Sequence, residues 1–219
     1  SRAGRMSASR TPLLATRFSP IDFLPAPRTS RVFVDPALSG MATSQLYRYA
    51  SLPEALAVLH TGAFGFAHPS SWTDHYETRL AEALGRDPDG HTVFARSFTT
   101  NFASEALWQL YRRDLSVVRI GIKLNGLLAA LDEAGAREGF HTYLARARYL
   151  PPAAFNRALR ERAGARTPHD VASLLAMKRQ GFEYENEVRV IAFPDVPRAT
   201  PYFGITLPAS LEIASLLLD

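Results

Sequence analysis

The chain of 219 residues contains no cysteine, which excludes disulfides, cysteine nucleophiles and thiolate zinc sites and leaves the redox compartment open. It has no apolar run near the roughly 20 residues that span a bilayer, so we expect no membrane span. No two of the six histidines stand three or four residues apart, and we therefore expect no metal site. A glycine-rich phosphate loop and internal repeats are also absent from the sequence.

Basic charge is concentrated at the start of the chain. Residues 1–40 hold six arginines and two aspartates, an excess equal to the whole net charge of +4. The remainder is balanced and does not indicate a phosphate-binding surface. Residues 1–44 are rich in serine, arginine and proline without helical periodicity, so we interpret them as an extended basic arm.

The arm has three open interpretations: an adaptor or export signal, a linker, or upstream sequence. Short apolar pieces at 21–24 and 32–34 could dock on the body. Because the arm has little core-forming pattern, we expect that deleting residues 1–40 leaves the fold intact.

Strand and helix patterns alternate from residue 45, which predicts one catalytic-like α+β domain over 45–219 with a mixed, largely antiparallel sheet and flanking helices. Strands are expected at 45–50, 63–69, 91–99, 115–124, 140–150, 182–193, 201–208 and 211–218. Helices are expected at 51–60, 74–85, 104–113, 125–135, 151–164 and 167–181. Capping-box patterns open two of them, Ser51 with Glu54 and Asp74 with Glu77.

The acidic segment FEYENEVRVIAF at 182–193 is the most informative stretch. As a strand it places Glu183, Glu185 and Glu187 on one face, because strand side chains alternate. Three like charges on one face repel unless the face meets solvent or a polar site. Two interpretations remain open: an active-site wall, or a solvated sheet edge on which Arg189 pairs back to Glu187.

Two other strands carry polar groups that suit a ligand. Arg48 stands between Tyr47 and Tyr49, where its guanidinium could hold phosphate or carboxylate oxygens and the rings a planar group. A surface arginine on an edge strand is the alternative. Ser97 and Thr99 point to one side of their strand and could orient a ribose or support a glutamate.

This order of arginine, hydroxyl strand and Glu-x-Glu resembles the signature of the mono-ADP-ribosyltransferases. The resemblance implies an ADP-ribosyltransferase-like fold that cleaves the nicotinamide–ribose bond of NAD and transfers ADP-ribose to an unknown protein or nucleic-acid acceptor. It implies that Glu187 is catalytic, stabilising positive charge on the ribose, and that Glu185 orients the acceptor. The residues to which it gives contact with NAD are Arg48, Ser97, Thr99, Tyr47 and Tyr49.

A second resemblance covers most of residues 46–193. The chain is similar to a bacterial domain family of unknown function that has Leu-Tyr-Lys-Tyr and Tyr-Glu-x-Glu-x-Arg motifs. The matching pieces are LYRYASL, SFT, the Trp108-x-x-Tyr111 helix and YENEVRVI. This family brings no established activity. Taken with the first resemblance, it implies an ADP-ribosyltransferase-like bacterial toxin, effector or defence protein, either cytoplasmic or exported. Trp108 fits core packing better than the pocket.

Two other classes of function stay open. One is a non-enzymatic interaction or ligand-binding module on the same fold. The other is a nuclease, which the balanced body and the lack of an Asp–His cluster disfavour. An enzyme requires Arg48, Ser97 and Glu187 on adjacent strands around one pocket, and a binding module does not.

Overall fold

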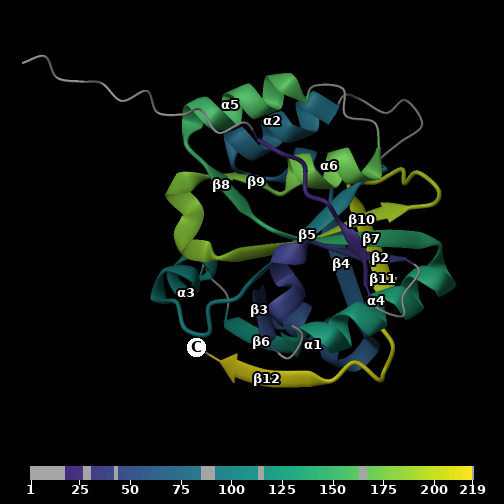
Figure 1. Ribbon diagram of the computed structural model, residues 1–219. Coiled ribbons are helices and arrows are strands. Elements are labelled where there is room, and N and C mark those ends of the chain that lie inside the picture. The colour runs from purple at the N-terminus through teal and green to yellow at the C-terminus, as the bar shows by residue number, and fades with distance from the viewer. Residues whose placement is uncertain are drawn as a thin grey trace, which may run out of the picture.

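The computed structural model describes residues 18–26, 31–41, 44–84, 92–112, 116–162 and 167–218, with the backbone alone for 81–84. These parts form a large sheet with helices on both faces (Figure 1). The strands of this sheet are β1 Leu24–Pro25, β2 Val32–Val34, β3 Gln45–Ser51, β4 Ala63–Ala67, β5 Phe94–Thr99, β6 Val117–Lys123, β7 Phe140–Arg146, β10 Glu187–Pro194, β11 Tyr202–Thr206 and β12 Ile213–Leu218. A separate small sheet joins β8 Arg148–Leu150 and β9 Met177–Arg179.

The helices cover the sheet in two groups. They are α1 Leu52–Thr61, α2 His75–Leu84, α3 Glu105–Tyr111, α4 Leu124–Glu138, α5 Pro152–Glu161 and α6 Pro168–Leu175, with 3₁₀ turns η1 Pro36–Met41, η2 Pro69–Ser71 and η3 Gln180–Glu185. In Figure 1, α2, α5 and α6 lie on one side, and α1 and α4 on the other. A mixed α+β fold with flanking helices is therefore confirmed.

The strand order is β1-β2-β7-β10-β5-β3-β6-β12, with β4 joining β5 and carrying β11. All pairings of the large sheet are antiparallel except β2 with β7, so its predicted mixed, largely antiparallel character is confirmed. Strand β10 is central and buried along its whole length, with β5 on one side and β7 on the other. This central place fixes the surroundings of the acidic segment.

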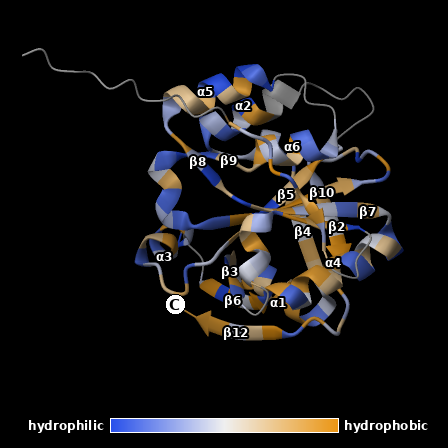
Figure 2. Cartoon of the chain, viewed as in Figure 1, coloured by the Kyte–Doolittle hydropathy of each residue, from blue (hydrophilic) through white to orange (hydrophobic). Residues whose placement is uncertain are grey.

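Two cores lie on the two faces of β10. Val188 and Val190 pack into the core under α1 and α4, whereas Ile191 and Phe193 pack into the core under α5 and α6. In Figure 2 the hydrophobic colour gathers around β4, β10 and β12, while α2 and α5 carry long hydrophilic stretches. Because both faces of β10 are covered, a charged side chain that it carries inward needs partners.

The segment before β10 differs from the prediction. Helix α6 ends at Leu175 rather than near 181, and β9 and η3 follow before β10 begins at Glu187. Pairing of β9 with β8 outweighs the local helical preference of the LLAMKRQ stretch. Glu183 and Glu185 therefore lie on a 3₁₀ turn, and the argument that placed three glutamates on one strand face is wrong.

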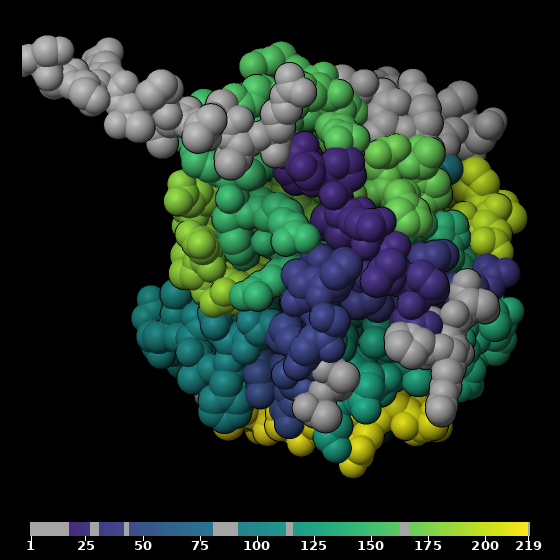
Figure 3. Space-filling model, in the orientation of Figure 1, coloured from purple at the N-terminus to yellow at the C-terminus, as the bar shows by residue number. Residues whose placement is uncertain are grey.

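Where the structure describes the arm, its apolar pieces at 21–24 and 32–34 are docked on the body, the alternative that the sequence left open. Strand β2 pairs in parallel with β7, and Ile21, Phe23 and Val32 are buried in the two cores. Asp35 is fully buried, and its carboxylate accepts two hydrogen bonds from Arg148, at 3.0 Å each. Figure 3 shows this purple segment packed lengthwise against later parts of the chain.

This docking has a physical reason: β2 pairs with the edge of β7, and the apolar side chains of Ile21, Phe23 and Val32 are removed from water in the two cores. Residues 18–26 and 31–41 are therefore part of the domain, and the expectation that residues 1–40 are dispensable does not fit the structure. Residues 1–17 lie outside the described part of the chain.

Candidate functional site

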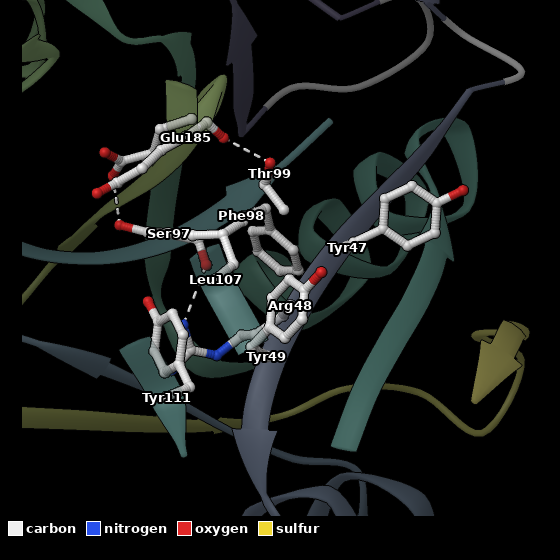
Figure 4. A pocket seen from close by; sticks show the side chains of 10 residues that line it. Tyr47, Arg48, Tyr49, Ser97, Phe98, Thr99, Leu107, Tyr111 and Glu185 are labelled. Atoms are coloured by element: carbon white, nitrogen blue, oxygen red, sulfur yellow. Dashed lines mark hydrogen bonds between the residues drawn. The ribbon is translucent and has the colours of Figure 1, made fainter. Parts of the chain in front are cut away.

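Three neighbouring strands bring the predicted residues to one pocket. Glu187 opens β10, Ser97 lies on β5 and Arg48 on β3, and these strands are adjacent in that order. Their side chains meet at a hollow that opens to solvent, and about 290 Å³ of space, some of it open solvent, lies among the lining atoms (Figure 4). The lining residues are Tyr47, Arg48, Tyr49, Ser97, Phe98, Thr99, Leu107, Tyr111, Glu185 and Glu187. All seven residues selected from the sequence are among these ten.

A split in the sheet creates the hollow. Tyr47 of β3 pairs with Thr99 near the end of β5. Near the start of β5, Ala95 pairs instead with Ala67 of β4. Between these two pairings the edge of β5 faces side chains instead of a strand. The polar atoms of Arg48 therefore reach the main chain of β5, where Nη1 donates to the Ser97 carbonyl at 3.1 Å.

Glu54 holds two arginines in this split. Its Oε1 accepts from Arg48 Nε at 3.1 Å and from Arg96 Nη2 at 2.6 Å. The Ser51 hydroxyl caps the helix as predicted, by accepting from the Glu54 amide, but the Glu54 side chain does not complete the capping box. Burial and the charge of Arg48 lower the pKa of Arg96 to about 9. Burial alone would raise the pKa of Glu54, yet Arg48 and Arg96 lower it.

Glu187 is the most enclosed acid of the pocket, with a side chain only 2% exposed. Its Oε1 accepts from Ser97 Oγ at 2.5 Å and from Arg189 Nε at 2.6 Å. Its Oε2 accepts from Lys178 Nζ at 2.6 Å and from Arg189 Nη2 at 3.2 Å. Burial opposes ionisation, but Arg189 and Lys178 lower the pKa of Glu187 to about 2, so it is a carboxylate with both oxygens engaged.

Glu185 lies nearer the solvent and is less engaged. Its side chain is 13% exposed, and its Oε2 accepts from Lys178 Nζ at 2.6 Å. Within the described ranges its Oε1 has no hydrogen-bond partner, so this oxygen can meet a ligand. Burial raises the pKa of Glu185, with Glu187 adding to the rise and Lys178 opposing it. The pKa values of Glu185 and Glu187 therefore shift in opposite directions, as in sites where one carboxyl group acts as an acid and the other as a base.

The turn that carries Glu185 is fastened to the end of β5. Thr99 Oγ1 donates to the Glu185 carbonyl at 2.5 Å, and Asn101 Nδ2 donates to the Tyr184 carbonyl at 2.6 Å. Asn186 makes the sharp turn into β10 with φ of 43°, a left-handed conformation that asparagine tolerates. Thr99 thus acts through the backbone of the acidic turn rather than through a carboxylate.

Aromatic rings form the rest of the wall. Tyr49 stacks on Tyr111 with ring centroids 5.9 Å apart and meets Trp108 edge-on at 4.7 Å. Tyr111 is 42% exposed at the mouth, whereas Trp108 packs behind Tyr49 and is not among the lining residues, which agrees with its predicted packing role. Tyr47 points away from Ser97 in Figure 4 and packs edge-on against Phe102.

A buried ion network lies behind the glutamates, and only its contact between Arg189 and Glu187 was among the sequence-based interpretations. Arg189 bridges Glu187 and Glu77, and Lys178 bridges Glu187 and Glu185. Burial alone would lower the pKa of Arg189, but Glu187 and Glu77 raise it. The predicted pairing of Arg189 with Glu187 exists, but it is buried rather than on a solvated edge. Glu77, predicted as a cap, is the second partner of this arginine.

The sequence indicates some members of this network and not others. Glu187 and Arg189 share a strand face, which their spacing indicates. Lys178 gave no signal, because its stretch has a helical pattern. Asp74 does cap α2, by accepting from the Tyr76 amide at 2.8 Å.

No family model, curated protein or solved structure matches this chain. Among the residues that the structure describes, no group of three or more His, Asp or Glu side chains could hold a metal ion. No helix in the described ranges is both long and apolar enough to cross a membrane.

Proposed function

We propose that the pocket binds NAD and that the protein is an ADP-ribosyltransferase-like enzyme. It would cleave the nicotinamide–ribose bond and transfer ADP-ribose to a protein or nucleic-acid acceptor. The observation that supports this most is the contact of Ser97 Oγ with Glu187 Oε1 at 2.5 Å, in the pocket that Arg48 enters from the second strand away. Three polar groups chosen from separate sequence segments thus meet at one place, as the reaction requires.

The hollow is open to solvent, so NAD would enter it by one end only. Nicotinamide and its ribose would lie at the mouth against the lining side chains, and the rest of NAD would extend outward. The ring of Tyr111, exposed there, offers a face on which a planar group can stack.

Arg48 is the group that would meet a phosphate. Its Nε and Nη1 are bound to Glu54 and to the Ser97 carbonyl, which fixes the plane of the guanidinium. Its Nη2 makes no hydrogen bond within the described residues and is available to an anionic oxygen. A fixed guanidinium loses little freedom on binding, so this contact favours NAD in the ground state and the transition state alike.

The two glutamates would divide the chemistry. Glu187 is ionised and lies deepest, where its charge stabilises the positive charge that develops on the ribose. Because both of its oxygens are engaged, a ribose hydroxyl reaches Oε1 only when the Ser97 hydroxyl rotates away. Glu185, with a raised pKa and a free oxygen toward solvent, would take the proton of the acceptor.

A nicotinamide-release assay and transfer from labelled NAD to lysate acceptors test these roles. Glu187→Gln should lower turnover by about a hundredfold or more while NAD still binds, because the charge acts only as the ribose becomes positive. Glu185→Gln should spare NAD hydrolysis and impair transfer. If wild-type protein releases no nicotinamide with any lysate, the proposed reaction is wrong.

A ligand-binding module on the same fold is the second candidate. The observation that favours it is the saturation of Glu187, which leaves neither oxygen free for a substrate in this structure. In that case Arg48 would bind an anionic ligand and Glu187 would stabilise the fold. NAD binding without nicotinamide release, unchanged in Glu187→Gln protein that is folded, would support this candidate.

A further inference from the structure

Lys178 connects the two carboxylates of the pocket. It comes from β9, the short strand that replaces the end of a predicted helix, and its side chain is 10% exposed. Its Nζ lies 2.6 Å from Glu185 Oε2 and 2.6 Å from Glu187 Oε2. One ammonium group therefore holds a carboxylate of the η3 turn and a carboxylate of β10 together.

Other groups face this ammonium from each element packed around it. Glu77 of α2 lies 3.9 Å away, and the ring of Phe182 on η3 lies 5.1 Å away. Arg189 of β10 repels the Lys178 ammonium group electrostatically. The hydroxyl oxygen of Tyr149 on β8 accepts a hydrogen bond from the Glu187 backbone amide at 2.8 Å. Burial raises the pKa of Tyr149 to about 12, so this phenol is neutral near neutral pH. The cluster thus contains three carboxylates and two cations.

Arg189 cannot take over the task of Lys178. It bonds to Glu187 and Glu77, and its remaining Nη1 donates to the Leu175 carbonyl at 2.7 Å. In the described part of the chain, Lys178 is the only cation bonded to Glu185. Without it, Glu185 and Glu187 would be neighbouring like charges in a partly buried site, where one of the pair takes up a proton.

We propose that Lys178 is a positioning residue: it keeps Glu185 and Glu187 ionised together and turns the free oxygen of Glu185 toward the pocket. This rests on the proposed function, in which both carboxylates face the substrate. Burial alone would lower the pKa of Lys178, but Glu187, Glu77 and Glu185 raise it, so the amine stays protonated and does not act as a nucleophile.

The chain offers an internal control, because Lys178 and Lys123 are its two lysines. Lys123 lies on the surface, with a side chain 50% exposed. Lysine labelled with ¹³C at Cε gives two resonances in the unmodified protein, which Lys123→Arg assigns. Lys178 should stay protonated above the ordinary lysine range, which is centred at about 10.4, because Glu187, Glu77 and Glu185 raise its pKa. Titration of the Lys178 resonance within that ordinary range would overturn the proposal.

Variants test the effect on the carboxylates, read from ¹³C-labelled glutamate. In Lys178→Met, the resonance of Glu185 or Glu187 should titrate with a midpoint higher by about one pH unit or more. Lys178→Gln replaces this variant if Lys178→Met does not fold. Lys178→Arg should keep the lower midpoint because it keeps the charge. Arg179→Met is the matched control, since Arg179 on the same strand bonds to Asp74 instead, at 2.7 Å. Unchanged midpoints in folded Lys178→Met or Lys178→Gln protein would overturn the proposal.

Activity adds a separate readout. If the protein turns over NAD, Lys178→Met should add an acid limb to the pH profile of turnover, because the glutamates must ionise to work. A pH profile like that of the wild type would contradict the proposal. The titrations need no NAD, so they test the role of Lys178 even if the protein has no turnover. Absence of turnover would contradict only the proposed reaction.

Discussion

Glu187→Gln should destabilise the protein strongly, independently of any activity. Glutamine keeps the shape of the side chain but removes the negative charge that faces Lys178 and Arg189 at 2.6 Å each. Its amide group also directs hydrogens at one of these cations, so a donor meets a donor. Two buried cations would then share Glu77 and Glu185 alone.

The size of this loss of stability follows from the pKa shift of Glu187 and from the usual cost of breaking a buried ion pair. Glu187 has its pKa lowered from 4.5 to about 2, and at about 1.4 kcal/mol per unit this corresponds to about 3 kcal/mol of folding stability. Removal of one partner from a buried ion pair costs about 3–5 kcal/mol. The two agree, so we expect the free energy of unfolding to fall by about 3 kcal/mol, a large part of the total for a domain of this size.

Urea unfolding near neutral pH, followed by circular dichroism, measures this loss. Glu212→Gln is the control, because the Glu212 side chain is 78% exposed and its loss should change stability by less than about 0.5 kcal/mol. A loss below about 1 kcal/mol in Glu187→Gln would refute the buried network as a source of stability. Combining it with Lys178→Met should give a double-mutant coupling of about 1–3 kcal/mol, because the two charges are in contact.

Further predictions concern the rest of the domain. Because the pKa of Glu187 is lower in the folded chain, its contribution is complete above about pH 4.5 and is lost as the pH falls toward about 2, which acid titration of stability should show. Deletion of residues 1–40 should abolish cooperative thermal unfolding, since it removes β2 and its buried side chains; an unchanged melting transition would contradict the docked segment. Asp35→Ala should cost about 2–3 kcal/mol in urea unfolding, because buried donors lose their acceptor; a loss under 1 kcal/mol would contradict this. Gly62→Ala should cost at least about 1 kcal/mol in the same assay, because φ is 68° and the added Cβ would lie 2.4 Å from the Leu207 carbonyl oxygen. Gly40→Ala is the control, because among the described residues other than its chain neighbours nothing lies within 4 Å of an added Cβ.

Much of the sheet was predictable because its strands have strong local patterns. The β-branched run of β6 and the aromatic residues of β3 and β5 favour strands without knowledge of their partners. The shared face of Ser97 and Glu187 follows from alternation once their strands pair, because Glu187 opposes Thr99 and Arg189 opposes Ser97. Arg48 does not follow from it: Tyr47 opposes Thr99, so Arg48 starts on the other face and reaches the Ser97 carbonyl through the split between β3 and β5. Their chemistry was inferred from residue type and order alone.

The rest depends on pairing between distant segments. Strand β9 exists because it pairs with β8, and β2 because it pairs with β7, more than 100 residues later. No local window contains these partners, so the stretch around Lys178 was assigned to a helix and that around Val32 to an arm. The acidic turn was read as a strand because the left-handed conformation of Asn186 leaves no periodic trace.

Calorimetric titration of NAD into the wild type, Arg48→Ala and Arg137→Ala tests the central claim most directly. We expect saturable binding to the wild type and binding weakened by about tenfold or more in Arg48→Ala. Arg137→Ala should bind like the wild type, because the Arg137 side chain is 45% exposed on α4. No saturable heat with the wild type up to millimolar NAD, or equal affinity in Arg48→Ala, would contradict the assignment of this pocket to NAD.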